Sequence, residues 1–159
     1  MKPAKSATGF LLPLTVTVLC AAALTPAAAE AQGRYPGHRG RELIVGIGGK
    51  CLDIANGDVR NGAQLILFDC HGRWNQRFSV RDGLIVGMDG KCLDVRGGVP
   101  QSGAPIVLWD CHGGPNQQWQ VRPDGLIVGI GNKCLDVRGG APVNGAPIIL
   151  WDCHGRENQ

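Results

Sequence analysis

Residues 91–119, KCLDVRGGVPQSGAPIVLWDCHGGPNQQW, decide the fold because the chain contains three versions of this stretch. Each version opens with a cysteine, has a second cysteine nineteen positions later and a glutamine six positions after that. The opening residues are Cys51, Cys92 and Cys134, so the period is 41 and then 42 residues. Self-similarity of this length is typical of folds built from repeated units that share a core.

The first thirty-one residues are expected to be a signal peptide, outside the fold. Lys2 and Lys5 precede an uncharged apolar run of sixteen residues, 9–24, and small residues follow, with cleavage expected after Ala29 or Ala31. The run is shorter than the roughly 18 apolar residues that span a bilayer, so a removed leader is favoured over a retained anchor. We therefore expect a secreted, extracellular protein with no membrane association after cleavage.

The remaining 128 residues are enough for one domain. We expect a flexible N-terminal arm over 32–41 and a folded domain over 42–159. The 14 Lys and Arg residues of this part alternate with its 12 Asp and Glu residues, so nucleic acid is not an expected partner. The oligomeric state stays open.

Six cysteines remain after cleavage, and an even number in an exported chain favours disulfides. Fifteen pairings are possible, but the repeat favours the same pairing in each copy: Cys51 with Cys70, Cys92 with Cys111, and Cys134 with Cys153. The alternative is a zinc site, because a histidine follows each second cysteine. Adjacent residues of a strand point to opposite faces and no Cys-x2-Cys spacing is present, so neither a metal nor a cofactor is expected.

Each repeat has the pattern of short strands and turns, with no helical period. The apolar runs 43–46, 84–87 and 126–129 end in glycine and lead into Lys-Cys-Leu-Asp segments. A connection rich in glycine and proline then precedes 65–68, 106–109 and 148–151, whose branched and aromatic residues favour strands. A last short strand begins at 76–78 and 117–119.

Four-stranded units of about 42 residues cannot each bury a face alone, so the three must share one core around a pseudo-threefold axis. A propeller is less suitable because it usually has at least four blades. We therefore predict an all-β protein with the β-trefoil fold. The residues expected to face inward are Leu52, Leu67, Phe78, Leu93, Leu108, Trp119, Leu135 and Leu150.

The third repeat is expected to be incomplete at the C-terminus. No counterpart of residues 118–128 follows Gln159. The third repeat would therefore lack its last strand and core aromatic, which would leave an unpaired edge and a hole at the barrel axis. An incomplete chain is favoured over a short form closed by dimerisation or by the N-terminal arm.

The combination of Cys-Leu-Asp-Val, Leu-Trp-Asp-Cys-His and Asn-Gln-x-Trp resembles the ricin B-type lectin repeat. It is most similar to the β-trefoil carbohydrate-binding modules of bacterial xylanases and related secreted glycosidases, and the resemblance covers 43–159. It implies that an aspartate, an aromatic residue, a histidine and an Asn-Gln pair line a sugar pocket in each repeat. The implied residues are Asp53, Phe68, His71, Asn75 and Gln76; Asp94, Trp109, His112, Asn116 and Gln117; and Asp136, Trp151, His154, Asn158 and Gln159.

These residue types suit a pyranose, which has an apolar face and a rim of hydroxyl groups. A flat aromatic ring can lie under the face, while carboxylate and amide groups bond the hydroxyls. The sequence leaves two alternatives open: Trp109 could be a core residue, because 106–109 is apolar throughout, and the glutamines could brace the fold. Phe68 gives a smaller platform than tryptophan, and Ile66, Val107 and Ile149 stand where plant members have a polar residue.

The expected function is a secreted carbohydrate-binding lectin for galactose- or xylose-type sugars or polysaccharides. The alternatives are a trefoil protein-interaction module, such as a protease inhibitor or a cytokine-like ligand, and the binding module of a secreted glycosidase. An enzyme is not expected, because Glu157 is the one glutamate in the repeats and three near-equal catalytic sites are improbable in so small a domain.

Overall fold

The computed structural model describes residues 40–159, so the predicted signal peptide and all but the last two residues of the predicted arm lie outside the described residues. The described chain is all β, with short 3-10 turns between strands. The strands are β1 (Glu42–Leu43), β2 (Cys51–Ile54), β3 (Ala63–Phe68), β4 (Arg77–Arg81), β5 (Leu84–Val86), β6 (Cys92–Val95), β7 (Ile106–Trp109), β8 (Gln120–Val121), β9 (Ile127–Gly129), β10 (Lys133–Val137) and β11 (Ala146–Asp152). The 3-10 turns are η1 (Ile47–Gly49), η2 (Ala55–Gly57), η3 (Trp74–Gln76), η4 (Met88–Gly90), η5 (Arg96–Gly98), η6 (Pro115–Gln117), η7 (Ile130–Asn132) and η8 (Arg138–Gly140). Within this part of the chain, none of the helices is long and apolar enough to cross a membrane.

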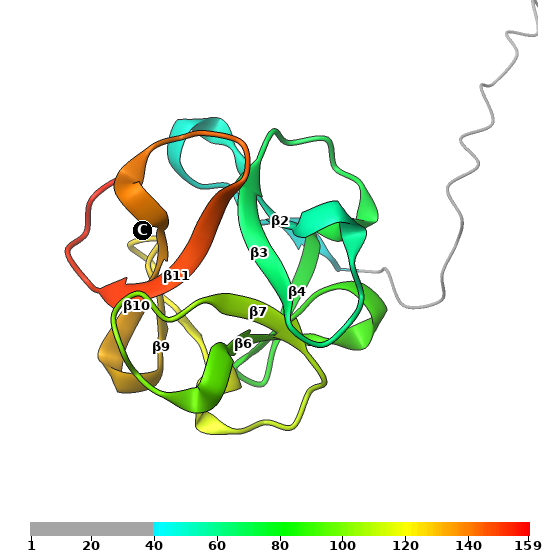
Figure 1. Cartoon of the computed structure of the whole chain (residues 1–159), viewed down its shortest axis with the longest axis vertical. Helices are drawn as coiled ribbons and strands as arrows, with labels where there is room; N and C mark the ends of the chain where they lie inside the picture. The colour runs from blue at the N-terminus through cyan, green and yellow to red at the C-terminus, as the bar shows by residue number, and fades with distance from the viewer. Residues whose placement is uncertain (1–39) are drawn as a thin grey trace, which may run out of the picture. The chain divides into compact units, whose positions relative to one another are not determined.

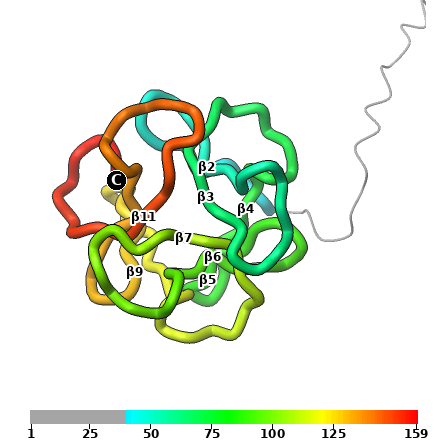
Figure 2. Tube along the Cα trace, in the orientation of Figure 1, coloured from blue at the N-terminus to red at the C-terminus, as the bar shows by residue number. Residues whose placement is uncertain are grey.

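The repeats form three lobes around a central axis (Figures 1 and 2). The first repeat contains β1 to β4, the second β5 to β8 and the third β9 to β11. Each repeat contributes one antiparallel hairpin, made of β2 and β3, β6 and β7, or β10 and β11. Pairing of β3 with β7 and β11, and of β4 with β5, joins the repeats into the predicted trefoil.

The register of the hairpins decides which side chains face outward. In the second repeat Leu93 pairs with Leu108, and the flanking pairs are Cys92 with Trp109 and Asp94 with Val107. The other two hairpins have the equivalent register. Successive side chains alternate between faces and paired residues share a face, so Leu93 and Leu108 face the core. Asp94 and Trp109 therefore lie together on the outer face.

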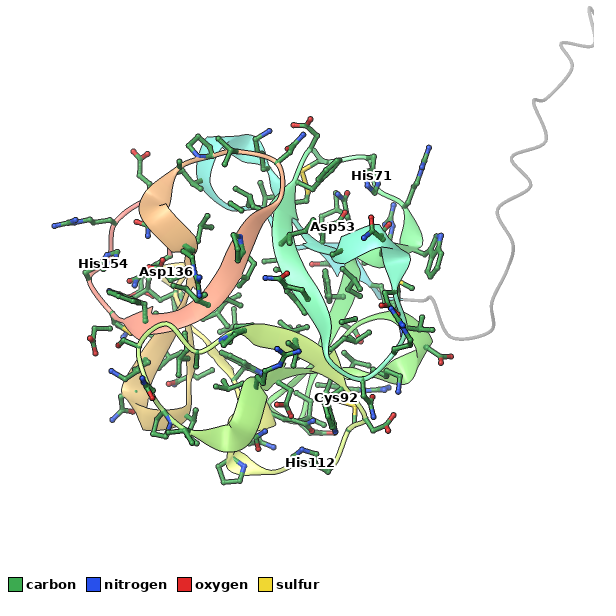
Figure 3. The ribbon with its side chains drawn as sticks, in the orientation of Figure 1. Asp53, His71, Cys92, His112, Asp136 and His154 are labelled. Carbon is green, nitrogen blue, oxygen red and sulfur yellow. A yellow bond between two sulfur atoms is a disulfide. The ribbon has the colours of Figure 1, made fainter. Side chains whose placement is uncertain are left out.

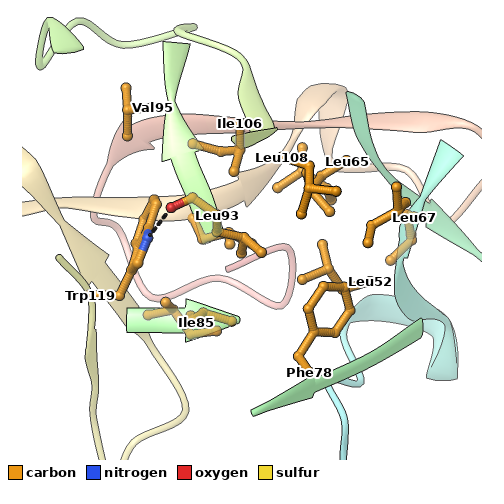
Figure 4. Packing of buried hydrophobic residues seen from close by; sticks show 14 of the residues in the cluster. Leu52, Leu65, Leu67, Phe78, Ile85, Leu93, Val95, Ile106, Leu108 and Trp119 are labelled. Carbon is orange, nitrogen blue, oxygen red and sulfur yellow. Dashed lines mark hydrogen bonds between the residues drawn. The ribbon is translucent and has the colours of Figure 1, made fainter. Parts of the chain in front are cut away.

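One hydrophobic core lies where the repeats meet (Figure 4). It contains every residue predicted to face inward: Leu52, Leu67, Phe78, Leu93, Leu108, Trp119, Leu135 and Leu150. Trp119 also donates a hydrogen bond from Nε1 to the carbonyl oxygen of Leu93, at 3.0 Å. This bond satisfies the polar atom of an otherwise buried ring.

The core is filled less completely beside the third repeat. The aromatic rings of the first two repeats each pack over a glycine of the following repeat, Phe78 over Gly87 and Trp119 over Gly129. The contact is so close that a Cβ on these glycines would lie 3.0 and 2.6 Å from the rings. A Cβ on the equivalent Gly46 would meet only a Leu67 methyl group, at 3.8 Å. An apolar cavity of about 60 Å³ lies here, lined in part by Ile44, Leu52, Leu67, Ile127, Leu135 and Ile148. No aromatic ring lies within 4 Å of a Cβ at Gly46, and this glycine lines the cavity.

The three predicted disulfides are formed: Cys51 with Cys70, Cys92 with Cys111, and Cys134 with Cys153. Each joins the first strand of a hairpin to the segment that follows the second strand. The cysteines of the three Cys-His pairs are therefore oxidised and offer no thiolate to zinc. Among residues 40–159, no group of three or more His, Cys, Asp and Glu side chains could hold a metal ion.

A polar cluster joins each repeat to its neighbour, and we call these the interrepeat clusters. In each, a lysine contacts an aspartate of its own repeat and an asparagine or serine of the preceding one: Lys50, Asp69 and Asn144; Lys91, Asp110 and Asn61; Lys133, Asp152 and Ser102. The hydrogen bond from the lysine holds the pKa of each aspartate below its ordinary value. The three clusters link the repeats in a closed ring.

Candidate functional site

Each repeat carries one polar cluster on the outer face of its hairpin. At its centre is a nearly buried aspartate: Asp53, Asp94 or Asp136, with 3%, 4% and 3% of its surface exposed. The aspartate accepts hydrogen bonds from the Nδ2 atom of Asn75, Asn116 or Asn158, at 2.9, 2.8 and 2.9 Å, and from the Nε2 atom of Gln76, Gln117 or Gln159, at 2.8, 2.8 and 2.9 Å. The structure thus brings together the predicted polar residues of every repeat.

The histidine of each cluster lies beside the aspartate; Figure 3 labels His71 with Asp53 and His154 with Asp136. The Nε2 atoms of His71, His112 and His154 lie 3.3, 3.3 and 3.2 Å from the carboxylates. Each Nδ1 atom accepts a hydrogen bond from the backbone N–H two residues further on, at 3.2, 3.1 and 3.2 Å. A neutral imidazole that accepts at Nδ1 carries its proton on Nε2, so the N–H of the neutral ring points at the carboxylate.

The glutamines are braces, which is one of the two roles that the sequence left open. Gln76 and Gln117 are fully buried. The Oε1 atom of Gln117 accepts from the backbone N–H groups of His112 and Gly113, and its Nε2 atom donates to Asp94 and to the carbonyl oxygen of Asp110. Gln76 and Gln159 make the equivalent bonds. This use of every amide atom differs from the expectation that the glutamines face a ligand, and makes them positioning residues.

The carboxylates of the second and third repeats keep a free acceptor. Both amide bonds go to the Oδ2 atoms of Asp94 and Asp136. No buried side-chain nitrogen or oxygen among residues 40–159 lacks a hydrogen-bond partner, so the Oδ1 atoms of these aspartates reach the surface. Each can accept from the hydroxyl group of a ligand.

The aromatic residues stand beside these carboxylates at the surface. The strand register places Trp109 and Trp151 on the outer face of their hairpins, not in the core, and 39% and 41% of their surface is exposed. In the first repeat the smaller Phe68 is half-buried and lies edge-on to His71, with ring centroids 6.2 Å apart. There both carboxylate oxygens of Asp53 already accept amide bonds, and burial raises its pKa. The first cluster therefore offers a smaller ring and no carboxylate oxygen that is free of an amide bond.

An open cleft of about 510 Å³ lies over the third repeat. Four of the predicted site residues line it, together with Ile149: Asp136, Trp151, His154 and Asn158. It also contains Arg138 and Arg156, which the sequence did not mark as site residues. One feature of the sequence could have identified Arg138 as a site residue: it directly follows Asp-Val, and the second repeat has an arginine, Arg96, at the same position.

Residues 41–159 match the ricin-type beta-trefoil lectin domain. The match covers almost all of the described chain, and the protein belongs to this family. The resemblance to the ricin B-type repeat is therefore confirmed. Membership of a family of carbohydrate-binding modules supports carbohydrate binding.

Solved structures with the same fold include a designed threefold-symmetric protein and natural lectins and enzymes. The designed protein, ThreeFoil, is 30% identical, with a TM-score of 0.68 over 75% of this chain and 93% of that one. An exo-beta-1,3-galactanase from Clostridium thermocellum is 29% identical, with a TM-score of 0.66 over 75% of this chain and 28% of the enzyme. The agglutinin from Abrus precatorius is 23% identical, with a TM-score of 0.67 over 75% and 46% of the two chains. This chain thus spans less than half of the two natural proteins. A comparison with curated proteins finds no match.

Proposed function

We propose that this protein is a secreted lectin that binds galactose- or xylose-type sugars and their polysaccharides through three shallow surface sites. The observation that carries the proposal is the threefold recurrence of one constellation, an aromatic ring beside an aspartate, a histidine and an asparagine. An apolar sugar face can stack on the ring while hydroxyl groups donate to the carboxylate and bond the asparagine. The three disulfides fit an oxidising, extracellular location.

The second and third repeats hold the stronger sites in this proposal. Both combine an exposed tryptophan, Trp109 or Trp151, with a free carboxylate oxygen on Asp94 or Asp136. The first repeat has Phe68 and a carboxylate whose two oxygens are both bonded within the chain. The similarity to the galactanase supports a galactose-type ligand among the candidates.

A glycan array and a binding assay with free sugar as competitor test the proposal. The secreted protein should bind galactose- or xylose-containing glycans, and the Trp109→Ala/Trp151→Ala variant should lose most of this binding. The matched control is Val80→Ala/Val121→Ala, which also shortens two exposed apolar side chains but lies away from the sites. Protein capture that free sugar does not displace would favour an interaction module. Turnover of a glycoside would favour an enzyme.

The binding module of a larger glycosidase is a second candidate, favoured by the similarity to the galactanase. The chemistry of the three sites is the same in both cases. Mass spectrometry of the protein from the culture medium distinguishes them, because a free lectin has the mass of the chain after cleavage at Ala29 or Ala31. The same spectrum tests the signal peptide.

A further inference from the structure

An arginine stands at the edge of the sites in the second and third repeats and is missing from the first. Arg96 and Arg138 begin η5 and η8, and the equivalent residue of the first repeat is Ala55 at the start of η2. The guanidinium of Arg96 donates to the carbonyl oxygen of Gly62, at 3.2 Å, and that of Arg138 to Gly103, at 3.3 Å. Each arginine is therefore held by a loop of the preceding repeat.

The same two glycines lie against the tryptophan rings. A Cβ on Gly62 would be 3.3 Å from the Arg96 guanidinium and 3.9 Å from the ring of Trp109. A Cβ on Gly103 would be 3.7 Å from the ring of Trp151, and the Gly103 carbonyl accepts the bond from Arg138. The arginine and the aromatic platform thus meet at one glycine in both sites. In the first repeat no such contact exists within 4 Å of the equivalent Gly145.

The cleft of the third repeat also has an excess of positive charge. Arg138 and Arg156 line it, and its one acidic residue is the nearly buried Asp136. A guanidinium has five N–H donors, and Arg138 uses one of them for Gly103. No other hydrogen bond or ion pair of this guanidinium is formed among residues 40–159, so the other donors are free for a ligand in the cleft. In the first repeat the loop after Ala55 carries Asp58, which is paired with Arg60 at 2.6 Å, so this loop offers no unpaired guanidinium.

We propose that the sites of the second and third repeats prefer a sugar that carries an anionic group, the carboxylate of a uronic acid or a sulfate ester, and that the first repeat does not. This inference rests on the proposed carbohydrate binding. The planar guanidinium bonds a carboxylate or sulfate through two parallel N–H groups. The neighbouring tryptophan holds the pyranose that carries it, so the platform gives affinity and the arginine gives selectivity.

Two matched pairs of polymers test the proposal: xylan substituted with glucuronic acid against the same xylan after carboxyl reduction, and sulfated against neutral galactan. The protein should bind at least one anionic polymer up to about fivefold more tightly than its neutral partner, the upper end of the range for an exposed charge pair. Near 1 M NaCl the difference should disappear, because salt screens exposed charges. The pair in which the anionic polymer binds more tightly shows whether the sites prefer a carboxylate or a sulfate group.

Arg96→Gln/Arg138→Gln should remove this preference, so that binding to the anionic polymers falls about fivefold more than binding to the neutral ones. The control Arg77→Gln/Arg122→Gln lowers the net charge equally, and Arg77 also bonds a glycine carbonyl, that of Gly72, away from these sites. The control should keep the preference. Equal binding to both members of each pair, equal loss of neutral and anionic binding in the first variant, or loss of the preference in the control would each overturn the inference. Failure to bind any sugar would instead overturn the proposed function.

Discussion

One position of the repeat carries different aromatic side chains, and this difference sets an expected order of the sites. Trp109→Ala should weaken binding to the second site about tenfold, the upper range for an aromatic contact, whereas Phe68→Ala should change the first site less. Trp109 is 39% exposed and Phe68 half-buried, so the tryptophan offers more surface to a sugar. NMR titration with a monosaccharide follows each repeat separately. Equal losses in the two repeats, with the fold intact, would contradict the ranking.

The glutamine of each cluster acts on the site through its neighbours, and Gln117 tests this. Gln117→Ala should lower the free energy of unfolding by about 1–3 kcal/mol, because it leaves buried polar groups without partners. Its neighbour Gln118 is exposed and makes one bond, of 3.3 Å, to the carbonyl oxygen of Gly113. Gln118→Ala should therefore be nearly neutral. Urea unfolding measures both variants, and similar losses would show that Gln117 is no more important than a surface residue.

Within the elements, the interrepeat clusters make stability depend on acid pH. The folded-state pKa values of Asp69, Asp110 and Asp152 are lowered, so their contribution is complete above the unfolded value, about 4, and is lost as the pH falls through the folded values. The raised pKa of Asp53 acts in the opposite direction, but on one residue against four, because hydrogen bonds from Arg60 also lower the pKa of Asp58 to about 2. The melting temperature should therefore fall below pH 4.

The variant Asp69→Asn/Asp110→Asn/Asp152→Asn isolates this effect. It should melt at a lower temperature than the wild type at pH 7 and show a shallower decline below pH 4, because the three lysine-bonded carboxylates are gone. Asp82→Asn, in the turn between β4 and β5, is the control and should keep the wild-type profile. Calorimetry from pH 7 to pH 2 measures the three profiles. Parallel curves for the wild type and the triple variant would place the acid sensitivity elsewhere.

The hairpins show what the sequence could predict and what it could not. The spacing of the cysteines was sufficient for the disulfides, and the recurring aliphatic residues were sufficient for the core, because both repeat at fixed offsets. The strand 106–109 was ambiguous, since four apolar residues in a row give no alternation. The pairing of Leu93 with Leu108 resolves it and turns Trp109 outward. Arg138 could not be assigned, because its place in the site depends on a carbonyl of another repeat, Gly103.

Across the whole molecule, three related clusters around one axis favour, under the proposed function, ligands that can reach more than one of them. A shallow site that exchanges hydrated hydroxyl groups for a few hydrogen bonds should be weak, with a dissociation constant on the order of millimolar. Even the second and third repeats offer only one exposed tryptophan and one free carboxylate oxygen each. Specificity for a polymer must then come from the number of sites engaged at once.

The last prediction follows from this valency. A branched or surface-bound galactan or xylan should bind about 10²- to 10⁴-fold more tightly than its monosaccharide, because a second contact forms at high effective concentration. Trp151→Ala should remove part of this gain and leave the monosaccharide affinity of the second site unchanged, whereas Trp109→Ala/Trp151→Ala should abolish the gain, since Phe68 alone remains as a platform. Titration with monosaccharide and polymer side by side measures both quantities. Binding of one monosaccharide at micromolar strength and a stoichiometry of one, with no gain from the polymer, would show that the clusters do not act together as several sugar sites.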